Sequence, residues 1–410
     1  IRFWSNGWIE KLYIDPAFHF KYWGFEWVKV PSPLSVYLLF IICALSTITI
    51  MIGFKYKWSI ITFFMTFTYI ELLDKTTYLN HYYFISVLSF LMIFLPLHKY
   101  YSYDARQNPV KYIPSYTINA IKMLIAIVYI YAGLAKLNPD WLFKAMPLAI
   151  WLPSKYTIPI LGDFLHQKWA HFIFSWAGAI FDLFIVLFLY LSPTRKWAYA
   201  ALVIFHLLTG VLFPIGMFPY IMIVSTLIFF ESSFHQNFLN RIEKVFGWGV
   251  GQFRSTKHLK PSKSLQRILV IFFAVQFLFP LRFLAYPGNI FWTEQGYRFS
   301  WRVMLMEKAG YAEFKIIDSE TKKFFMVDNK DFLTSFQEKQ MATQPDFIVE
   351  YAHHLGEHFM KQGHRNIEIY VNSYVALNGQ ESRPFINPEI DLLKIKDSFK
   401  HRTWVLPYHD

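Results

Sequence analysis

Residues 34–54 read LSVYLLFIICALSTITIMIGF, and no charged side chain interrupts them. A transmembrane helix needs about 20 consecutive apolar residues to cross the hydrocarbon core of a bilayer. This stretch has that length, and the basic residues Lys55 and Lys57 end it. It therefore predicts a membrane-spanning helix and places the chain in the class of integral membrane proteins.

Seven further apolar segments follow along the chain. Several are shorter than a full span, which predicts tilted or partly re-entrant passage through the bilayer. Only 17% of the 410 residues are charged and 55% are hydrophobic, whereas a soluble domain carries about 25% charged residues. We therefore expect a polytopic helical bundle of about eight spans. After the first, the segments cover residues 58–73, 82–97, 116–135, 171–191, 197–213, 215–230 and 268–284.

The character of the sequence changes at residue 286. A helical pattern covers residues 346–360, and alternation of apolar and polar residues, which is typical of half-buried strands, occurs at 314–318, 323–327 and 367–377. We therefore expect a mainly α fold in two parts. The parts are a transmembrane bundle over residues 1–285 and a smaller extramembrane α+β domain over residues 286–410.

The distribution of Lys and Arg predicts how the chain is oriented. The loops after the first, third, fifth and seventh segments are rich in Lys and Arg, and the opposite loops are poor in them. By the positive-inside rule the basic loops are cytoplasmic. The opposite loops, the residues before 34 and the C-terminal domain are then expected on the periplasmic or lumenal side. A cytoplasmic native N-terminus would require one further span before Ile1.

Charge and cysteine usage exclude several classes of protein. The net charge of +12 is dispersed among aromatic segments, so we interpret the basic residues as topology signals and expect no nucleic-acid partner. The single cysteine, Cys43, cannot form an intrachain disulfide. His354 and His358 share a helix face, but Leu355 stands where the zinc-protease pattern requires Glu. We therefore expect no metal site.

Lys136 lies at the end of the fourth apolar segment and has two interpretations. It can be an interfacial lysine that extends its ammonium group toward water. Alternatively, it can be partly buried in an apolar pocket, where desolvation favours the neutral amine, which can act as a base. The small residues Ala132, Gly133 and Ala135 just before it would allow close helix packing around that amine.

A second polar cluster follows the second apolar segment. Asp74 and Lys75 can form an interfacial ion pair, and His81 can cap the next helix, with Asn80 beside it. The predicted topology brings these residues to the same side of the membrane as Lys136. Because polar groups within a membrane usually mark a function, this convergence favours a shared site.

Asp182 and His206 lie inside the fifth and sixth segments. An uncompensated polar group is costly there, so a hydrogen bond between helices is the simplest role for each of them. His206 can instead line a pocket.

Three separated motifs carry a resemblance to a known family. They are LDKTTYLNH at 73–81, AGLAKLNPDW at 132–141, and FH at 205–206 followed by IGMFPY at 215–220. In order and spacing they resemble the signature segments of the vitamin K-dependent gamma-glutamyl carboxylases and their bacterial relatives, which share the horizontally transferred transmembrane (HTTM) domain. Further similarity to the family's lumenal portion occurs in GYRFSW at 296–301, NG at 378–379 and RPFINP at 383–388.

The resemblance implies the family's reaction. Vitamin K hydroquinone, or menaquinol, is oxygenated by O2, and the strong base so generated removes a γ-proton from a substrate glutamate, after which CO2 traps the carbanion. The implied partners are the lipid bilayer, from which the quinol enters, and a glutamate-containing protein or peptide, and no metal is implied. The implied location is the bacterial inner membrane, with the active site on the periplasmic or lumenal side.

The resemblance also implies roles for individual residues. Lys136 matches the lysine that deprotonates the hydroquinone, and His81 and Asn80 match residues that we assign to orienting the reacting groups. The residues implied in cofactor binding are His206, Met217, Phe218 and Trp141. Those implied in glutamate binding are Phe299, Ser300 and Trp301.

The chain departs from the animal enzymes at two of these positions. Ala135 precedes Lys136 where they have two consecutive lysines, and Phe299 replaces a tyrosine. These departures favour oxygenation over carboxylation.

Three functions follow from these patterns. The first is quinol-dependent carboxylation of peptidyl glutamate to γ-carboxyglutamate, coupled to quinol epoxidation. The second keeps the quinol chemistry without glutamate carboxylation. The third is a transporter or other non-enzymatic membrane protein. The sequence argues against a transporter, because it lacks the paired broken helices typical of inverted-repeat transporters.

Overall fold

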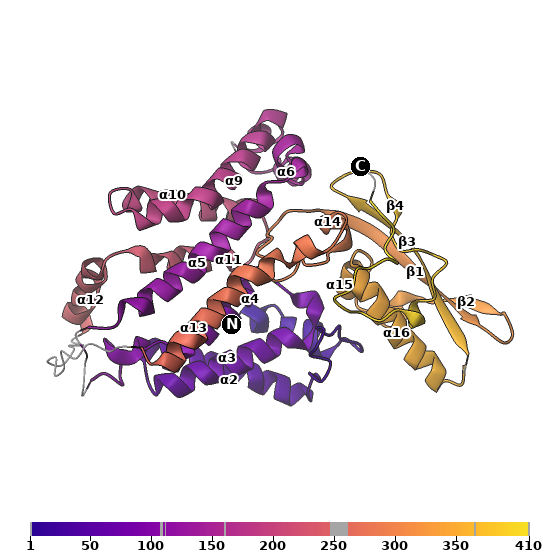
Figure 1. Cartoon of the computed structure of the whole chain (residues 1–410), viewed down its shortest axis with the longest axis horizontal. Coiled ribbons are helices and arrows are strands. Elements are labelled where there is room, and N and C mark those ends of the chain that lie inside the picture. The colour runs from indigo at the N-terminus through magenta and orange to yellow at the C-terminus, as the bar shows by residue number, and fades with distance from the viewer. Residues whose placement is uncertain are drawn as a thin grey trace.

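The chain is mostly helical and ends in a small β-sheet (Figure 1). The computed structural model describes residues 2–106, 110, 112–159, 161–246, 261–364 and 366–408.

Four helices among the described residues are long and apolar enough to cross a bilayer. Each coincides with one of the predicted apolar segments, so the chain is an integral membrane protein. The helices are α2 (Pro33–Ile52), α5 (Ser115–Lys136), α9 (Lys168–Tyr190) and α13 (Lys263–Leu278), which continues as the 3-10 helix η6 (Phe279–Ala285).

The other predicted segments also coincide with helices, but these are shorter or less apolar. They are α3 (Tyr56–Leu73), α4 (Asn80–Ile93), α10 (Arg195–Leu212) and α11 (Phe218–Ser225). After α11 the 3-10 helix η5 (Thr226–Phe229) leads to a bend of 110° into α12 (Ser232–Phe246), a pair that reads as one broken span or a re-entrant loop. Length and composition therefore support four or five spans within the described residues, and the count of eight stays a prediction.

Local sequence explains where the key helices begin and end. Ser32 caps α2 by accepting a hydrogen bond from the Ser35 backbone N–H. Pro33 follows at the first helical position, where the fixed φ of proline suits the helix. After α5 ends at Lys136, Asn138 accepts a hydrogen bond from the backbone N–H of Trp141 and so starts the short helix α6 (Pro139–Lys144). The sequence LNPDW thus holds Trp141 directly beyond Lys136.

The sheet is antiparallel, with strand order β2-β1-β3-β4. Its long central pair is β1 with β3, which runs from Lys308 opposite Leu377 to Asp318 opposite Ile367. The predicted strands and helix in this region are confirmed, although β1 starts six residues earlier than predicted, because Ala and Gly obscure its alternation. The elements are β1 (Lys308–Asp318), β2 (Phe324–Met326), α15 (Ser335–Met341), α16 (Pro345–Lys361), β3 (Ile367–Leu377) and β4 (Arg383–Pro384).

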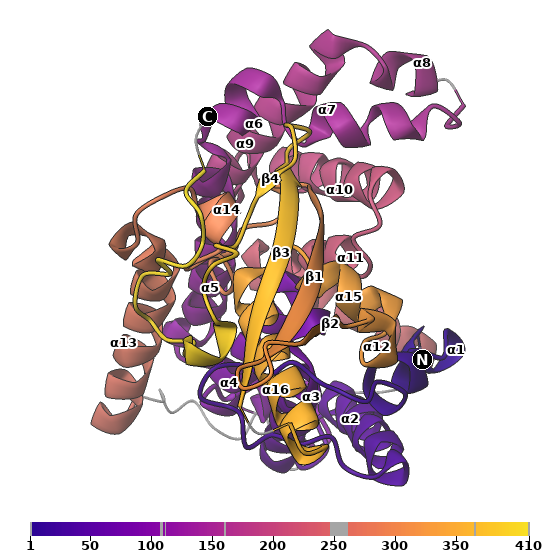
Figure 2. The same ribbon diagram turned by 90° about the vertical axis from the view of Figure 1, so that its right-hand side faces the viewer.

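Helices α15 and α16 lie against one face of the sheet, next to the transmembrane helices (Figure 2). The N-terminal segment lies against this layer. Phe20 stacks on Phe347 of α16 at 4.7 Å between ring centroids, and the backbone carbonyl of Phe18 accepts a hydrogen bond from Gln337 of α15. The helical part and the C-terminal region consequently share one apolar core.

Candidate functional site

The centre of the candidate site is a buried ion pair between α5 and α9. The Lys136 ammonium nitrogen lies 2.5 Å from a carboxylate oxygen of Asp182, and both side chains are 9% exposed. The same nitrogen lies 3.3 Å from the carbonyl of Ala132 and 5.5 Å from the ring centre of Trp141. Lys136 is therefore a buried lysine and does not extend toward water as an interfacial lysine would.

The hydrogen bond between helices that the sequence predicts for Asp182 is present, and its partner is Lys136. Asp182 is the one acidic residue on α5 and α9, and an isolated charge is very costly in that environment, so a basic partner for it is expected.

Close packing of α5 on α9 brings the two charges together. A Cβ atom at Gly133 would lie 2.8 Å from the backbone nitrogen of Leu183, closer than real contacts allow. Gly133 is one turn before Lys136, and Leu183 follows Asp182. The small residue that the sequence predicted at this interface is thus required for the approach of the two helices.

The ion pair faces a cavity of about 90 Å³ enclosed mostly by aromatic and aliphatic side chains. A water molecule needs roughly 10–15 Å³ of such volume, so the cavity has room for an aromatic ring and not for a peptide. Among the residues that line it are Trp141, His206 and Phe218. Three of the predicted site residues therefore share one cavity with Lys136.

His206 adds a polar group to this cavity. Its Nε2 lies 2.7 Å from the Tyr129 hydroxyl, which is the hydrogen bond between helices that the sequence favoured. Its Nδ1 is buried and has no hydrogen-bond partner among the described residues. Because buried polar atoms are normally satisfied, this nitrogen is available to a ligand in the cavity.

The remaining predicted residues lie around the cavity and not in it. Met217 is 46% exposed and does not contribute to the lining. His81 is buried, and its ring centroid lies 6.1 Å from that of Phe218, while His206 approaches the same ring at 5.8 Å. Asn80 donates a hydrogen bond to the backbone carbonyl of Arg302.

The loop over residues 299–304 has a strained backbone. Phe299, Trp301 and Met304 all have positive φ, between 54° and 60°, a conformation that is uncommon outside glycine and that clusters at functional sites. Ser300 and Trp301 are buried, and neither lines the Lys136 cavity. The expected glutamate-binding residues are therefore structural neighbours of the site and do not face Lys136.

The interpretation of Asp74 and Lys75 as an ion pair is wrong, because each of them has other partners. Asp74 instead caps the turn after α3 by accepting hydrogen bonds from Thr76, and it accepts another from Gln337 of α15. Burial raises the pKa of Asp74 to about 6, although these hydrogen bonds act in the opposite direction. The sequence could not reveal this arrangement, because Gln337 is 263 residues away.

Lys75 belongs to a buried charge network with α16. Its ammonium lies 2.9 Å from Asp346 and 3.0 Å from Glu350, and Arg298 lies 2.7 Å from Asp346. Burial raises the pKa of Asp346, but the charges of Arg298, Lys75 and Arg402 outweigh it and hold this pKa well below its usual range. The network fastens the connection between α3 and α4 to the C-terminal region.

The histidines of α16 have structural contacts. His353 hydrogen-bonds the backbone carbonyl of Ile395 at 2.7 Å, His354 stacks on Phe18, and His358 lies 2.9 Å from the Gln362 amide nitrogen. Across the described ranges, no three His, Cys, Asp or Glu side chains are grouped as metal ligands would be.

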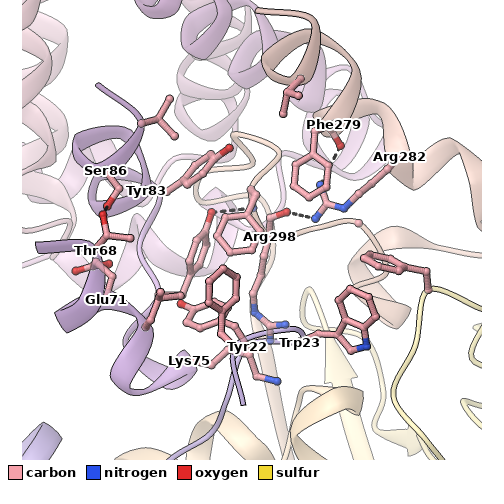
Figure 3. A pocket seen from close by; sticks show the side chains of 18 of the residues that line it. Tyr22, Trp23, Thr68, Glu71, Lys75, Tyr83, Ser86, Phe279, Arg282 and Arg298 are labelled. Carbon is pink, nitrogen blue, oxygen red and sulfur yellow. Dashed lines mark hydrogen bonds between the residues drawn. The ribbon is translucent and has the colours of Figure 1, made fainter. Parts of the chain in front are cut away.

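A second, larger cavity of about 740 Å³ lies between α3, α4, α13 and the C-terminal region (Figure 3). Phe299 lines this cavity, whereas Val303 and Met304 line the cavity of Lys136. The strained 299–304 loop thus forms part of the wall between the two cavities.

Two family models match different parts of the chain. Residues 1–234 match the family model described as the HTTM domain. Residues 261–410 match the model described as the vitamin K-dependent gamma-carboxylase, lumenal domain. No solved structure matches the chain.

Proposed function

The chain belongs to the vitamin K-dependent gamma-carboxylase family, and on this premise we propose that it is a membrane-bound, quinol-dependent carboxylase that converts peptidyl glutamate to γ-carboxyglutamate. The observation that carries the proposal is the Lys136–Asp182 pair at the wall of a small apolar cavity. The residues present suit a hydroquinone ring, because the lining is largely aromatic and His206 Nδ1 is buried without a partner among the described residues.

The quinol supplies the driving chemistry. When bound, vitamin K hydroquinone would react with O2 to give the epoxide and water and would supply a strong base on the way; that base would take the γ-proton of a glutamate, and the electron pair of the broken C–H bond would form the C–C bond to CO2. This balance needs no metal.

Lys136 can act as the base that activates the quinol only as a neutral amine. Its ion pair with Asp182 allows this, because transfer of the ammonium proton to the carboxylate leaves the pair neutral overall. No net charge is then created in an apolar environment, which would be costly. Asp182 thus holds the proton while Lys136 accepts one from a quinol hydroxyl.

The other residues orient the reacting groups and exclude water. His206 Nδ1 can hydrogen-bond a quinol oxygen, and the rings of Trp141 and Phe218 wall the cavity. His81 and Asn80 position other groups of the site. His81 lies next to the Phe218 ring, and Asn80 donates a hydrogen bond to the backbone carbonyl of Arg302. Exclusion of bulk water protects a carbanion from being reprotonated.

The proposal includes an orientation in the membrane. The positive-inside rule supports an arrangement of about eight spans with the site and residues 286–410 on the periplasmic or lumenal side, in a bacterial inner membrane. Residues 1–285 would then form the catalytic transmembrane domain. Vitamin K hydroquinone or menaquinol would reach the site from the bilayer.

One observation favours a second candidate function. Ser300 and Trp301 are buried outside the Lys136 cavity, so the expected glutamate contacts are weaker than those to a quinol. A quinol epoxidase that does not carboxylate glutamate fits this arrangement.

A single assay separates the candidates. Detergent-purified protein is incubated with reduced vitamin K, O2, labelled bicarbonate and a glutamate-containing peptide. We expect both epoxide and labelled peptide. Epoxide without labelled peptide would support the quinol epoxidase. The absence of both products from folded protein would favour a non-enzymatic function.

A further inference from the structure

The larger cavity has an amphipathic lining arranged in layers. Its deep part lies between α3, α4 and α13 and is lined by apolar side chains such as Phe64, Phe90 and Phe272. Its other end reaches charged residues near the C-terminal region, among them Lys75 and Arg298 (Figure 3). A ligand that fills the cavity must therefore combine an apolar part with a polar end.

Two polar groups mark the level at which the apolar part ends. Gln276, two residues before the end of α13, is 5% exposed, and its Oε1 is buried with no partner among the described residues. Glu71, two residues before the end of α3, lines the same cavity and forms no hydrogen bond or ion pair with the described part of the chain. A buried acceptor without a partner is destabilising, so Gln276 Oε1 is available to a ligand in the cavity.

Both groups accept hydrogen bonds, so the ligand must donate them. Most donors of the four cations at the charged end are already engaged, and the exception is the Nε of Arg402, which is buried with no partner among the described residues. Lys75 and Arg298 are ion-paired, and Arg282 donates to the backbone carbonyls of Phe279 and Arg298. A phospholipid, whose phosphate accepts hydrogen bonds, would therefore find few free donors in this cavity.

The cavity is close to the bilayer. Ile271 and Val275 line it from α13 and are 64% and 48% exposed. Aromatic rings, including Tyr83 and Phe279, form the walls near the two acceptors. A flat aromatic diol with an apolar chain matches this combination, with its hydroxyls on Gln276 and Glu71 and its chain in the deep part.

We infer that this cavity is a second binding site for an isoprenoid hydroquinone, separate from the Lys136 cavity and serving to hold quinol that has left the bilayer. The inference rests on the proposed function, since it takes the quinol as the ligand class. The 299–304 loop lies between the two sites and contributes Phe299 to one and Met304 to the other.

Photolabelling tests the inference. Purified protein is irradiated with a hydroquinone that carries a diazirine on its isoprenoid chain, and the labelled peptides are identified by mass spectrometry. We expect label on α3, α4 and α13, stronger for the reduced than for the oxidised reagent. In a Glu71→Leu/Gln276→Leu variant this label should fall at least about tenfold, the effect of losing about 1.4 kcal/mol, while label on α9 and α10 is retained.

Matched variants and competitors make the result decisive. Met65→Ala and Val270→Ala alter exposed residues of α3 and α13 outside the cavity lining and should leave labelling unchanged. Undiminished label in the Leu variant, equal label from the oxidised reagent, or displacement by phosphatidylglycerol and not by unlabelled quinol would each overturn the inference. Epoxide formation without label on α13 would overturn the second site while leaving the proposed function intact. Label on α13 without epoxide formation would contradict the proposed function while supporting the second site.

Discussion

At the scale of single residues, variants of the Lys136–Asp182 pair can separate its effect on stability from its effect on the reaction. Removing one partner of a buried ion pair leaves an uncompensated charge, which costs about 3–5 kcal/mol, whereas replacing both by neutral groups is often tolerated. Lys136→Met should therefore lower the Tm sharply, and Lys136→Met/Asp182→Asn should restore most of it. Both variants should form no epoxide. Epoxide production by the folded double variant would show that Lys136 is not the base.

His81 is predicted to affect the second half of the reaction more than the first. Its ring centroid lies 6.1 Å from that of Phe218, and it does not line the Lys136 cavity. His81→Ala should reduce label incorporation from bicarbonate at least about tenfold while epoxide formation falls less, since about 1.4 kcal/mol of lost positioning corresponds to a factor of ten. Equal losses of both products would contradict the assigned role, and His81→Gln serves as the conservative control.

Asp74 should make stability depend on pH. Its pKa is raised by burial to about 6, so its contribution favours the folded state at low pH and is lost as the pH rises through about 6. Between pH 5 and pH 7.5 this loss is about 1.4 kcal/mol. The Asp74→Asn variant lacks this loss, so its Tm relative to the natural protein should rise over that interval. A constant Tm difference would show that Asp74 does not titrate there.

At the scale of elements, the spacing of α5 and α9 sets the site. A methyl group at Gly133 would meet the Leu183 backbone at 2.8 Å, whereas one at Gly178 would meet nothing closer than 3.6 Å. Gly133→Ala should therefore destabilise the fold by about 1–3 kcal/mol and reduce epoxidation by separating Lys136 from Asp182. Gly178→Ala, on the partner helix, is the control for stability, and a thermal scan of each variant in detergent gives the comparison. Equal Tm values for the two variants would contradict the packing argument.

The elements also show what sequence can and cannot predict. Apolar length located the helices, and alternation located β3, because both patterns are local. The partner of Lys136 lies 46 residues away and that of Lys75 lies 271 residues away. Such pairings depend on how helices pack, so the motifs identified Lys136, His206, Trp141 and Phe218 as a group but gave neither Asp182 as the partner nor the buried placement of Ser300 and Trp301.

At the scale of the whole molecule, the charge network around Asp346 joins the membrane part to the C-terminal region. Its cations are Lys75, Arg298 and Arg402, and its anions are Asp346, Glu350 and Asp397. Asp346 is within 4.0 Å of all three cations, whereas Lys75 pairs with two of the anions. Neutralising Asp346 therefore removes the partner that the three cations share, whereas neutralising Lys75 leaves Asp346 with two cations.

We consequently expect Asp346→Asn to weaken the junction far more than Lys75→Met, by about 3–5 kcal/mol against a smaller cost for the lysine. Hydrogen exchange reports this directly, because amides of α16 and of the turn after α3 should lose protection together in Asp346→Asn, while those of α5 and α9 keep theirs. If the C-terminal region must stay docked for carboxylation alone, the same variant should retain epoxide formation and lose label incorporation. Equal loss of protection in the two variants would contradict the central position assigned to Asp346.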